Sequence, residues 1–176
     1  EQGVKWTLYD KTVANPTIDN IEEALQIYIK NQCDGLVAFG GGSSIDCAKG
    51  VAARVARPHK TIPQMKGVLK ILRRTPILFA VPTTSGTGSE ATLAAVITNS
   101  KTHEKYAIND TVVIPSYAVL DPKLTLGLPP HITSTTGMDA LTHAVEAYIG
   151  SSNTSETKKM AKDAIQLIVD NVYKAY

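Results

Sequence analysis

The sequence has little of what marks disulfide-stabilised, zinc-finger or membrane-spanning proteins. Its only two cysteines, Cys33 and Cys47, stand far apart and form neither a C-x-x-C pair nor zinc-finger spacing. A disulfide framework is therefore not indicated, and we expect both to be reduced core residues. There is no apolar run long enough to cross a bilayer and no signal peptide, so we expect a cytoplasmic protein without a membrane partner.

The sequence also has no large excess of positive or negative charge. The formal net charge is +2 over 176 residues, and the one basic run, Lys70 to Arg74, is interrupted by Ile71 and Leu72. Nucleic acid is therefore not expected as a partner. Apolar material is plentiful, with 43% hydrophobic residues, which is enough to bury a core. Because Glu1 is not a methionine and Tyr176 ends a helical stretch without a cap, we expect a piece of a longer polypeptide.

Strand and helix patterns alternate through the first half of the chain. Alternating residues predict a strand over Val4 to Tyr9, and Thr17 or Asp19 can cap the helix that follows. The continuous apolar run at 35–39 predicts an interior parallel strand that is covered on both faces, and a second such run spans 76–81. Parallel strands of one sheet end at the same edge, which is where open α/β sheets bind ligands.

A glycine turn follows the first of these two strands, in the motif GGGSSIDCAKG. Gly40, Gly41 and Gly42 remove every Cβ there, and Ser43 with Asp46 has the S-x-x-D spacing of a capping box. A helix that opens in this way presents free amides and the positive end of its dipole, which favour phosphate or pyrophosphate. A tight turn with a structural cap is the alternative, since the motif is not G-x-G-x-x-G.

The second strand runs into the loop PTTSGTGSE, which contains five hydroxyl side chains and two glycines. This loop can bond ribose or phosphate oxygens, although such loops are more often simple turns.

The rest of the sequence predicts loops and extended segments first, and helices after them. We expect a surface loop with a short helical piece at 58–74, extended segments at 92–98 and 106–114, and a short strand at 116–120. Beyond Pro129–Pro130 the period is helical to the end of the chain.

An acid and an imidazole stand one helical turn apart in GMDALTHAVEAY. Asp139 and His143 lie among small apolar neighbours, so the pattern predicts a buried helix with two metal-capable groups. A divalent cation would satisfy both, because iron, zinc and manganese share carboxylate and imidazole ligands. A simple Asp–His side-chain pair is the alternative.

The segments GGGSSIDCAKG, PTTSGTGSE, LDPKLTLGLPP and GMDALTHAVEAY, in this order, resemble the iron-containing (group III) alcohol dehydrogenases. The resemblance covers nearly the whole chain. It implies an α/β fold, with part of a parallel-sheet, dehydroquinate synthase-like nucleotide-binding domain at 1–128. The first helices of an all-helical metal-binding domain would follow at 129–176.

The resemblance also implies roles for residues near the glycine turn. Gly41, Gly42 and Ser43 would cradle the pyrophosphate of NAD or NADP, and Asp46 would be the capping acid of the helix.

The resemblance also implies residues that contact other parts of the dinucleotide. Thr83 and Thr84 correspond to the family's pair of hydroxyl residues at the dinucleotide. Asn15 falls in its NPT segment near the adenosine side, and Lys105 falls near the nicotinamide ribose. Ala94 departs from the family, where an Asn near the cofactor is common.

The metal site is implied only in part. Asp139 and His143 correspond to the first two ligands of the family's Fe²⁺ (or Zn²⁺), and its other two ligands are histidines further along than this sequence extends. His59, His103 and His131 do not match those motifs.

The implied function is an oxidoreductase that interconverts a small-molecule alcohol and its aldehyde or ketone by hydride transfer with NAD(P), with the metal polarising the substrate oxygen. Two alternatives stay open: a nucleotide-binding module without catalysis, and a metal-dependent lyase or synthase on the related dehydroquinate synthase-like fold. We expect a homo-oligomer, such as a dimer, for the full-length protein.

Overall fold

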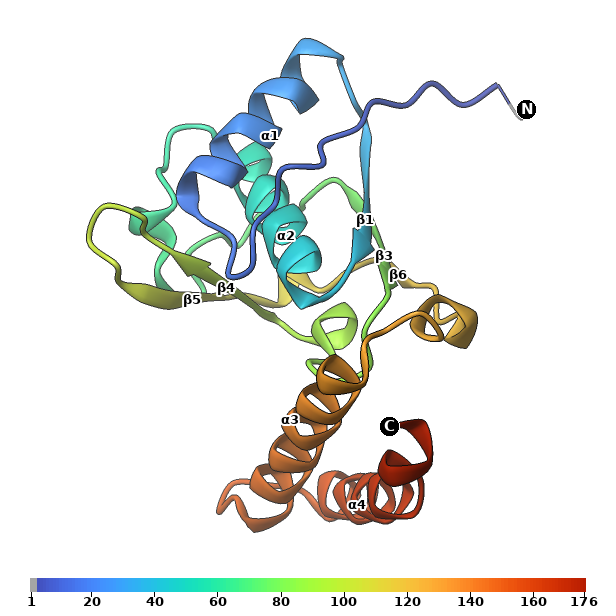
Figure 1. Ribbon diagram of the computed structural model, residues 1–176. Helices are drawn as coiled ribbons and strands as arrows, with labels where there is room; N and C mark the ends of the chain where they lie inside the picture. Colours follow the sequence, from blue (N-terminus) through green and yellow to red (C-terminus); the bar gives the residue numbers. More distant parts are fainter. Residues whose placement is uncertain (1–2) are drawn as a thin grey trace. The chain divides into compact units, whose positions relative to one another are not determined.

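A computed structural model describes residues 3–176 of the chain. They form two compact units (Figure 1). Unit 1 comprises the described residues up to Pro82 together with Ser89–Leu120, and unit 2 comprises Thr83–Gly88 and Asp121–Tyr176. Unit 1 is an α/β structure and unit 2 is mainly helical.

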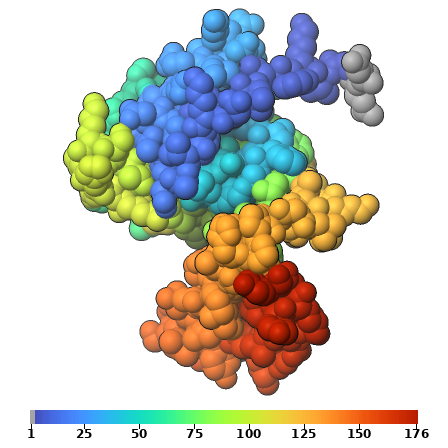
Figure 2. All heavy atoms as spheres, viewed as in Figure 1, coloured from blue at the N-terminus to red at the C-terminus, as the bar shows by residue number. Residues whose placement is uncertain are grey.

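Unit 1 begins with an extended segment and a capped helix. Thr17 caps α1 (Ile18–Lys30) through a capping box with Asn20, which confirms the sequence prediction for Thr17. The predicted strand over Val4 to Tyr9 is wrong, because this segment pairs with no strand in the described part of the chain. It runs over the outside of unit 1 (dark blue in Figure 2).

A three-stranded parallel sheet has the order β1 (Gly35–Gly40), β3 (Ile77–Pro82), β6 (Tyr117–Ala118). Helix α2 (Gly42–Ala56) covers one face of this sheet. The residues of the resulting core cluster are Ala38, Ile45, Leu78 and Ala80.

The two apolar strands predicted from sequence are confirmed, but among residues 3–176 β1 is an edge strand and not an interior one. It lies at the edge of the described sheet, and Val37 and Phe39 are 70% and 61% exposed. On β3 and β6, Phe79 and Tyr117 stack with ring centroids 4.8 Å apart. Only one face of β1 is therefore covered in this chain.

A second sheet has the order β2 (Gly67–Val68), β5 (Lys105–Asn109), β4 (Ala94–Thr98), with β4 and β5 antiparallel. The predicted extended segment at 92–98 is confirmed. The one at 106–114 is shorter than predicted, because Asp110 accepts a bond from the Val112 amide and starts the 3₁₀ helix η3 (Thr111–Val113).

The larger core of unit 1 lies between this sheet, α1 and α2. Its apolar side chains come from all three, and the predicted helical piece of the long loop, η1 (Pro63–Met65), adds Met65. Cys47 is in this core as predicted, whereas Cys33 is only half-buried. The buried residues of this core are Ile21, Leu25, Cys47, Val51, Ala53, Ile62, Met65, Ile71, Ala95, Ile97, Tyr106, Ile108 and Val113.

Unit 2 contains the 3₁₀ helix η4 (Pro122–Thr125) and two packed helices, α3 (Pro130–Ile149) and α4 (Ser155–Ala175). The helical prediction beyond Pro130 is confirmed. The helices approach closely at Gly137, where an added Cβ would lie 2.7 Å from Val172 Cγ2. Within residues 3–176, no helix is both long and apolar enough to cross a membrane.

Candidate functional site

The glycine turn joins β1 to the first turn of α2. Gly40 has φ +147°, and a Cβ there would lie 2.5 Å from Ser44 Oγ, so the turn requires glycine. Gly41 is the N-cap residue and Gly42 is the first residue of the helix. No side chain of the described residues caps this helix. Its first amides and the positive end of its dipole therefore face the space ahead of the turn, an arrangement that favours an anion.

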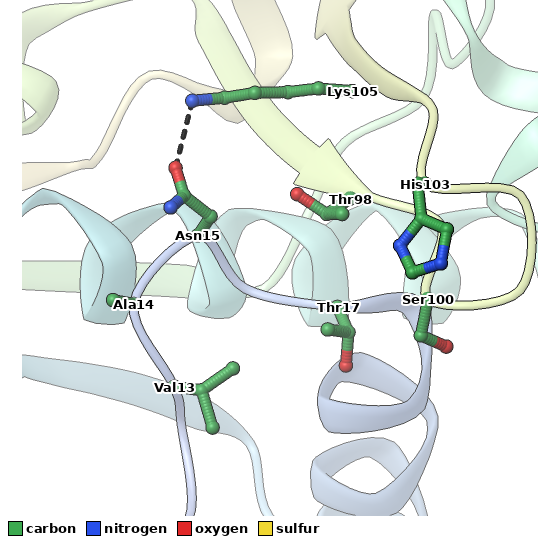
Figure 3. Close-up of a pocket in the computed structure, with 8 residues that line it drawn as sticks. All are labelled: Val13, Ala14, Asn15, Thr17, Thr98, Ser100, His103 and Lys105. Carbon is green, nitrogen blue, oxygen red and sulfur yellow. Dashed lines mark hydrogen bonds between the residues drawn. The ribbon is translucent and has the colours of Figure 1, made fainter.

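The predicted capping box of Ser43 and Asp46 is wrong, because Gly41 and not Ser43 is the N-cap residue. Ser43 Oγ instead accepts a hydrogen bond from the Asn15 amide at 3.1 Å. Asn15 has φ +56°, a left-handed conformation that asparagine tolerates better than most residues. Its Oδ1 accepts a hydrogen bond of 2.7 Å from Lys105 Nζ (Figure 3).

Three predicted cofactor-binding residues are thus linked to one another although they are far apart in the sequence. Asn15 precedes α1, Ser43 is in the first turn of α2, and Lys105 begins β5. Figure 3 shows the Lys105 side chain extending toward Asn15. Both residues line a cavity of about 440 Å³. The lining residues are Val13, Ala14, Asn15, Thr17, Thr98, Ser100, His103 and Lys105. The site combines an amide, hydroxyl groups and a cation, which suit a phosphorylated and hydroxylated ligand.

Asp46 points into unit 1 and not toward the amides of its own helix. Its Oδ1 accepts a bond of 2.6 Å from Ser89 Oγ, and its Oδ2 accepts one of 3.0 Å from the Val96 amide. Burial raises the pKa of this carboxyl above its usual value, against the effect of these two bonds and of the nearby Lys49 and Lys105.

Sequence reasoning missed Lys49, whose side chain is completely buried. Its Nζ donates to oxygens of Ser89, Thr92 and Ala94. Burial lowers the pKa of Lys49 from 10.5 to about 8, while Asp46 acts in the opposite direction. Its position in the sequence could have indicated a buried lysine, since Lys49 lies one turn after the buried Ile45 on an otherwise apolar stripe of the helix.

Thr83 and Thr84 belong to unit 2 and follow the last residue of β3. Both are half-buried. Their loop packs on α3 within that unit, because an added Cβ on Gly86 would lie 2.7 Å from Thr136 Cβ. The hydroxyl loop and the helix of the metal-capable pair are therefore parts of one compact unit.

Asp139 and His143 lie on α3, three and seven residues after Thr136, so the three share one helical face. Asp139 Oδ1 and His143 Nε2 are 3.9 Å apart, and their side chains are 42% and 55% exposed. The prediction of a buried helix is thus wrong, because α3 has only Ala144 buried in the described chain.

The pair fits part of a metal site. Metal–ligand bonds of about 2.0–2.2 Å place two donors on one ion slightly closer than 3.9 Å, so the two side chains would have to approach each other to share a cation. Among residues 3–176 no group of three or more His, Cys, Asp or Glu side chains could hold a metal ion. Asp139 and His143 would therefore supply two of the three or four ligands that such sites use.

The fold and the turn define a class: α/β proteins with a glycine turn at the carboxyl edge of a parallel sheet, where such folds bind ligands, followed here by a helical unit. The chain belongs to the iron-containing alcohol dehydrogenase family. Residues 1–122 match the family Iron-containing alcohol dehydrogenase, and residues 133–176 match the Fe-containing alcohol dehydrogenase family, C-terminal.

Individual relatives support this membership. Alcohol dehydrogenase 4 of Schizosaccharomyces pombe is 44% identical over 168 residues, which cover 96% of this chain and 40% of that protein. The structure of an alcohol dehydrogenase from Oenococcus oeni matches with a TM-score of 0.94 and 37% identity, over 98% of this chain and 45% of the other.

A third relative was solved with a bound dinucleotide. The structure of sulfoacetaldehyde reductase from Bifidobacterium kashiwanohense in complex with NAD⁺ matches with a TM-score of 0.87 and 32% identity, covering 97% of this chain and 46% of that one. The chain thus spans less than half the length of each of these three relatives.

Proposed function

We propose that this chain provides the dinucleotide-binding site and two metal ligands of an NAD(P)-dependent dehydrogenase. The enzyme would interconvert a primary or secondary alcohol and its aldehyde or ketone. The observation that carries the proposal is the linked set of Asn15, Ser43 and Lys105 at the uncapped start of α2.

Different residues of unit 1 would contribute different contacts to the dinucleotide. The amides of Gly41, Gly42 and Ser43 bind the pyrophosphate at the positive end of the helix dipole. Lys105 adds a positive charge, and its bond to Asn15 orients both side chains before the ligand arrives. Asp46 supports this arrangement by holding β4 through the Val96 amide.

The residues of unit 2 serve the reacting end of the ligands. Thr83 and Thr84 offer hydroxyl groups to the dinucleotide from the loop that packs on Thr136. Asp139 and His143 would hold a divalent cation, with iron favoured by the family description. Such a cation supplies Lewis-acid polarisation of an alcohol or carbonyl oxygen.

The names of the relatives support an alcohol or aldehyde as substrate. One is an alcohol dehydrogenase and another, solved with NAD⁺, is an aldehyde reductase. Both match the present chain over nearly its full length.

The test is dinucleotide binding and turnover by the full polypeptide loaded with Fe²⁺. NADH and NADPH are titrated by fluorescence, and alcohol oxidation is followed by nicotinamide absorbance. We expect Lys105→Met to weaken dinucleotide binding about tenfold, because the ligand loses a charged donor. Lys101→Met is the matched control, since Lys101 is an exposed lysine of the same hairpin. Equal effects of the two variants would contradict the assignment of Lys105.

A nucleotide-binding module without catalysis is a second candidate. It is favoured by the finding that the described residues contain no group of three metal-capable side chains. Dinucleotide binding without alcohol-dependent absorbance change, in the presence of Fe²⁺, would identify the module. Turnover that stops on chelation and returns with Fe²⁺ would identify the dehydrogenase.

A further inference from the structure

Lys49 places a fully buried ammonium group in the middle of α2. Its Nζ lies 2.8 Å from the carbonyl oxygen of Ala94, 2.9 Å from both the carbonyl and hydroxyl oxygens of Thr92, and 3.2 Å from Ser89 Oγ. Asp46 Oδ1 is 3.9 Å away. Three ammonium protons are thus shared among four close oxygens, so the side chain is fixed in one position.

The oxygens that accept these bonds lie in the segment 89–94, which leads into β4. Asp46, one turn earlier on α2, accepts a bond from Ser89 Oγ in this segment and another from the Val96 amide in β4. Two charged residues of α2 therefore fix where β4 begins. Burial lowers the pKa of Lys49 to about 8, so it still carries its charge at neutral pH.

Strand β4 connects this anchor to the glycine turn. In the antiparallel pair, Thr98 of β4 lies opposite Lys105 of β5. Lys105 bonds to Asn15, and the Asn15 amide bonds to Ser43, which is again on α2. Lys49 and Ser43, two residues of α2, are therefore also connected to each other through β4, β5 and Asn15. Figure 1 shows α2 beside the β4–β5 pair.

We propose that Lys49 is a positioning residue for dinucleotide binding, because it anchors β4 and through the β4–β5 hairpin sets where Lys105 and Asn15 stand relative to the glycine turn. This inference rests on the proposed function, since it assumes that Lys105 and Asn15 contact the dinucleotide. Lys49 itself touches no ligand in this scheme, because its ammonium group is enclosed by protein oxygens.

The first experiment compares two cations of the same helix in the full polypeptide. Lys49→Met removes the ammonium group and keeps most of the side-chain volume. Arg54→Met is the matched control, because Arg54 also makes several bonds, to Glu22 and to the carbonyl of Lys60 among others, but at the far end of α2. Both variants should lower thermal stability. Only Lys49→Met should raise the Kd for NADH or NADPH, by about tenfold.

A double-mutant cycle then asks whether Lys49 acts through Lys105. We expect Lys49→Met to raise the dinucleotide Kd about tenfold when Lys105 is present, but less than about threefold in a Lys105→Met background. Such non-additivity is not expected from a general loss of stability. Independent, multiplying effects would overturn the proposal, as would unchanged binding by Lys49→Met.

The outcomes separate this inference from the function on which it rests. Absence of dinucleotide binding by the unaltered protein would defeat the proposed function. Binding that is weakened by Lys105→Met and not by Lys49→Met would leave that function intact and defeat the role of Lys49. If Lys49→Met does not fold, Asp46→Asn/Lys49→Met is compared with Asp46→Asn alone, so that Lys49 is still the only difference between the two proteins. Equal dinucleotide affinity of these two variants would again contradict the proposal.

Discussion

Single buried polar side chains organise stretches of unit 1 that have little regular structure. Asp110 is almost completely buried and accepts hydrogen bonds from the amides of Ile71, Leu72 and Val112. Lys49 plays a comparable part for the segment that leads into β4. Unpaired buried amides and carbonyls would be costly, so each of these charged groups stabilises several residues of backbone at once.

The pH dependence of stability should reveal the buried ammonium. The pKa of Lys49 is about 8 in the folded protein and close to 10.5 in the unfolded chain. Below about pH 8 both states hold the proton and the full cost of burying the charge is present. Between about pH 8 and 10.5 the unfolded state binds more protons, so the free energy of unfolding should rise with pH.

Urea unfolding of the unaltered protein and of Lys49→Met across this pH range measures the effect. The unaltered protein should gain stability relative to the variant as the pH rises through the window. A difference between the two that stays constant with pH would contradict the lowered pKa.

Gly40 should tolerate no side chain. Gly40→Ala puts a Cβ at a left-handed φ and against Ser44, so we expect a loss of about 1–3 kcal/mol in the free energy of unfolding. Gly127→Ala is the control, because no atom lies within 4 Å of a Cβ there and its φ is not left-handed, and it should change stability by less than about 0.5 kcal/mol. Urea denaturation distinguishes the two, and similar losses in both variants would contradict the strained turn.

At the scale of elements, the local sequence pattern was sufficient to predict those strands and helices whose formation depends on neighbouring residues. The apolar runs ending at Phe39 and Val81 predicted β1 and β3, and the glycines after β1 predicted the start of α2. The role of Asp46 could not be read from spacing. Its partners Ser89 and Val96 lie 43 and 50 residues further along the chain, and they outcompete the amides of its own helix turn.

Other elements depended on partners that spacing does not reveal. The segment Val4 to Tyr9 alternates like a strand, but a strand needs a neighbour to pair with, and this one has none in the described residues. The link between Asn15 and Lys105 spans 90 residues, so position within motifs could suggest each residue but not their contact. Lys49 was overlooked because its four oxygen acceptors come from a different segment of the chain.

The contact between α3 and α4 gives a prediction whose sign depends on one neighbour. Gly137→Ala favours the helix by about 1 kcal/mol but places a Cβ 2.7 Å from Val172 Cγ2, so it should be neutral or destabilising. In a Val172→Ala background the space is free, and the same substitution should stabilise by about 1 kcal/mol. Thermal or urea unfolding of the four proteins measures this reversal. Stabilisation by Gly137→Ala in both backgrounds would show that the helices do not approach closely there.

At the scale of the whole molecule, metal and dinucleotide should bind through separate groups. In the full polypeptide, Asp139→Ala or His143→Ala should lose the metal and turnover while keeping the affinity for NAD(P)H, because the pair lies on α3 and the glycine turn lies on α2. His131→Ala is the control, since His131 is an exposed histidine in the first turn of the same helix. Elemental analysis that finds full metal occupancy in either of the first two variants would contradict their assignment as ligands.

The chain passes between the two units three times, after Pro82, after Gly88 and after Leu120. A single break in the backbone at any one of these crossings leaves the units joined through the remaining polypeptide. Neither unit corresponds to one uninterrupted stretch of sequence, so excising either requires severing the chain and rejoining it. A chimera that places unit 2 in a relative would therefore have to include the hexapeptide Thr83–Gly88 together with Asp121–Tyr176. The intervening Ser89–Leu120 belongs to unit 1 and would not be transferred.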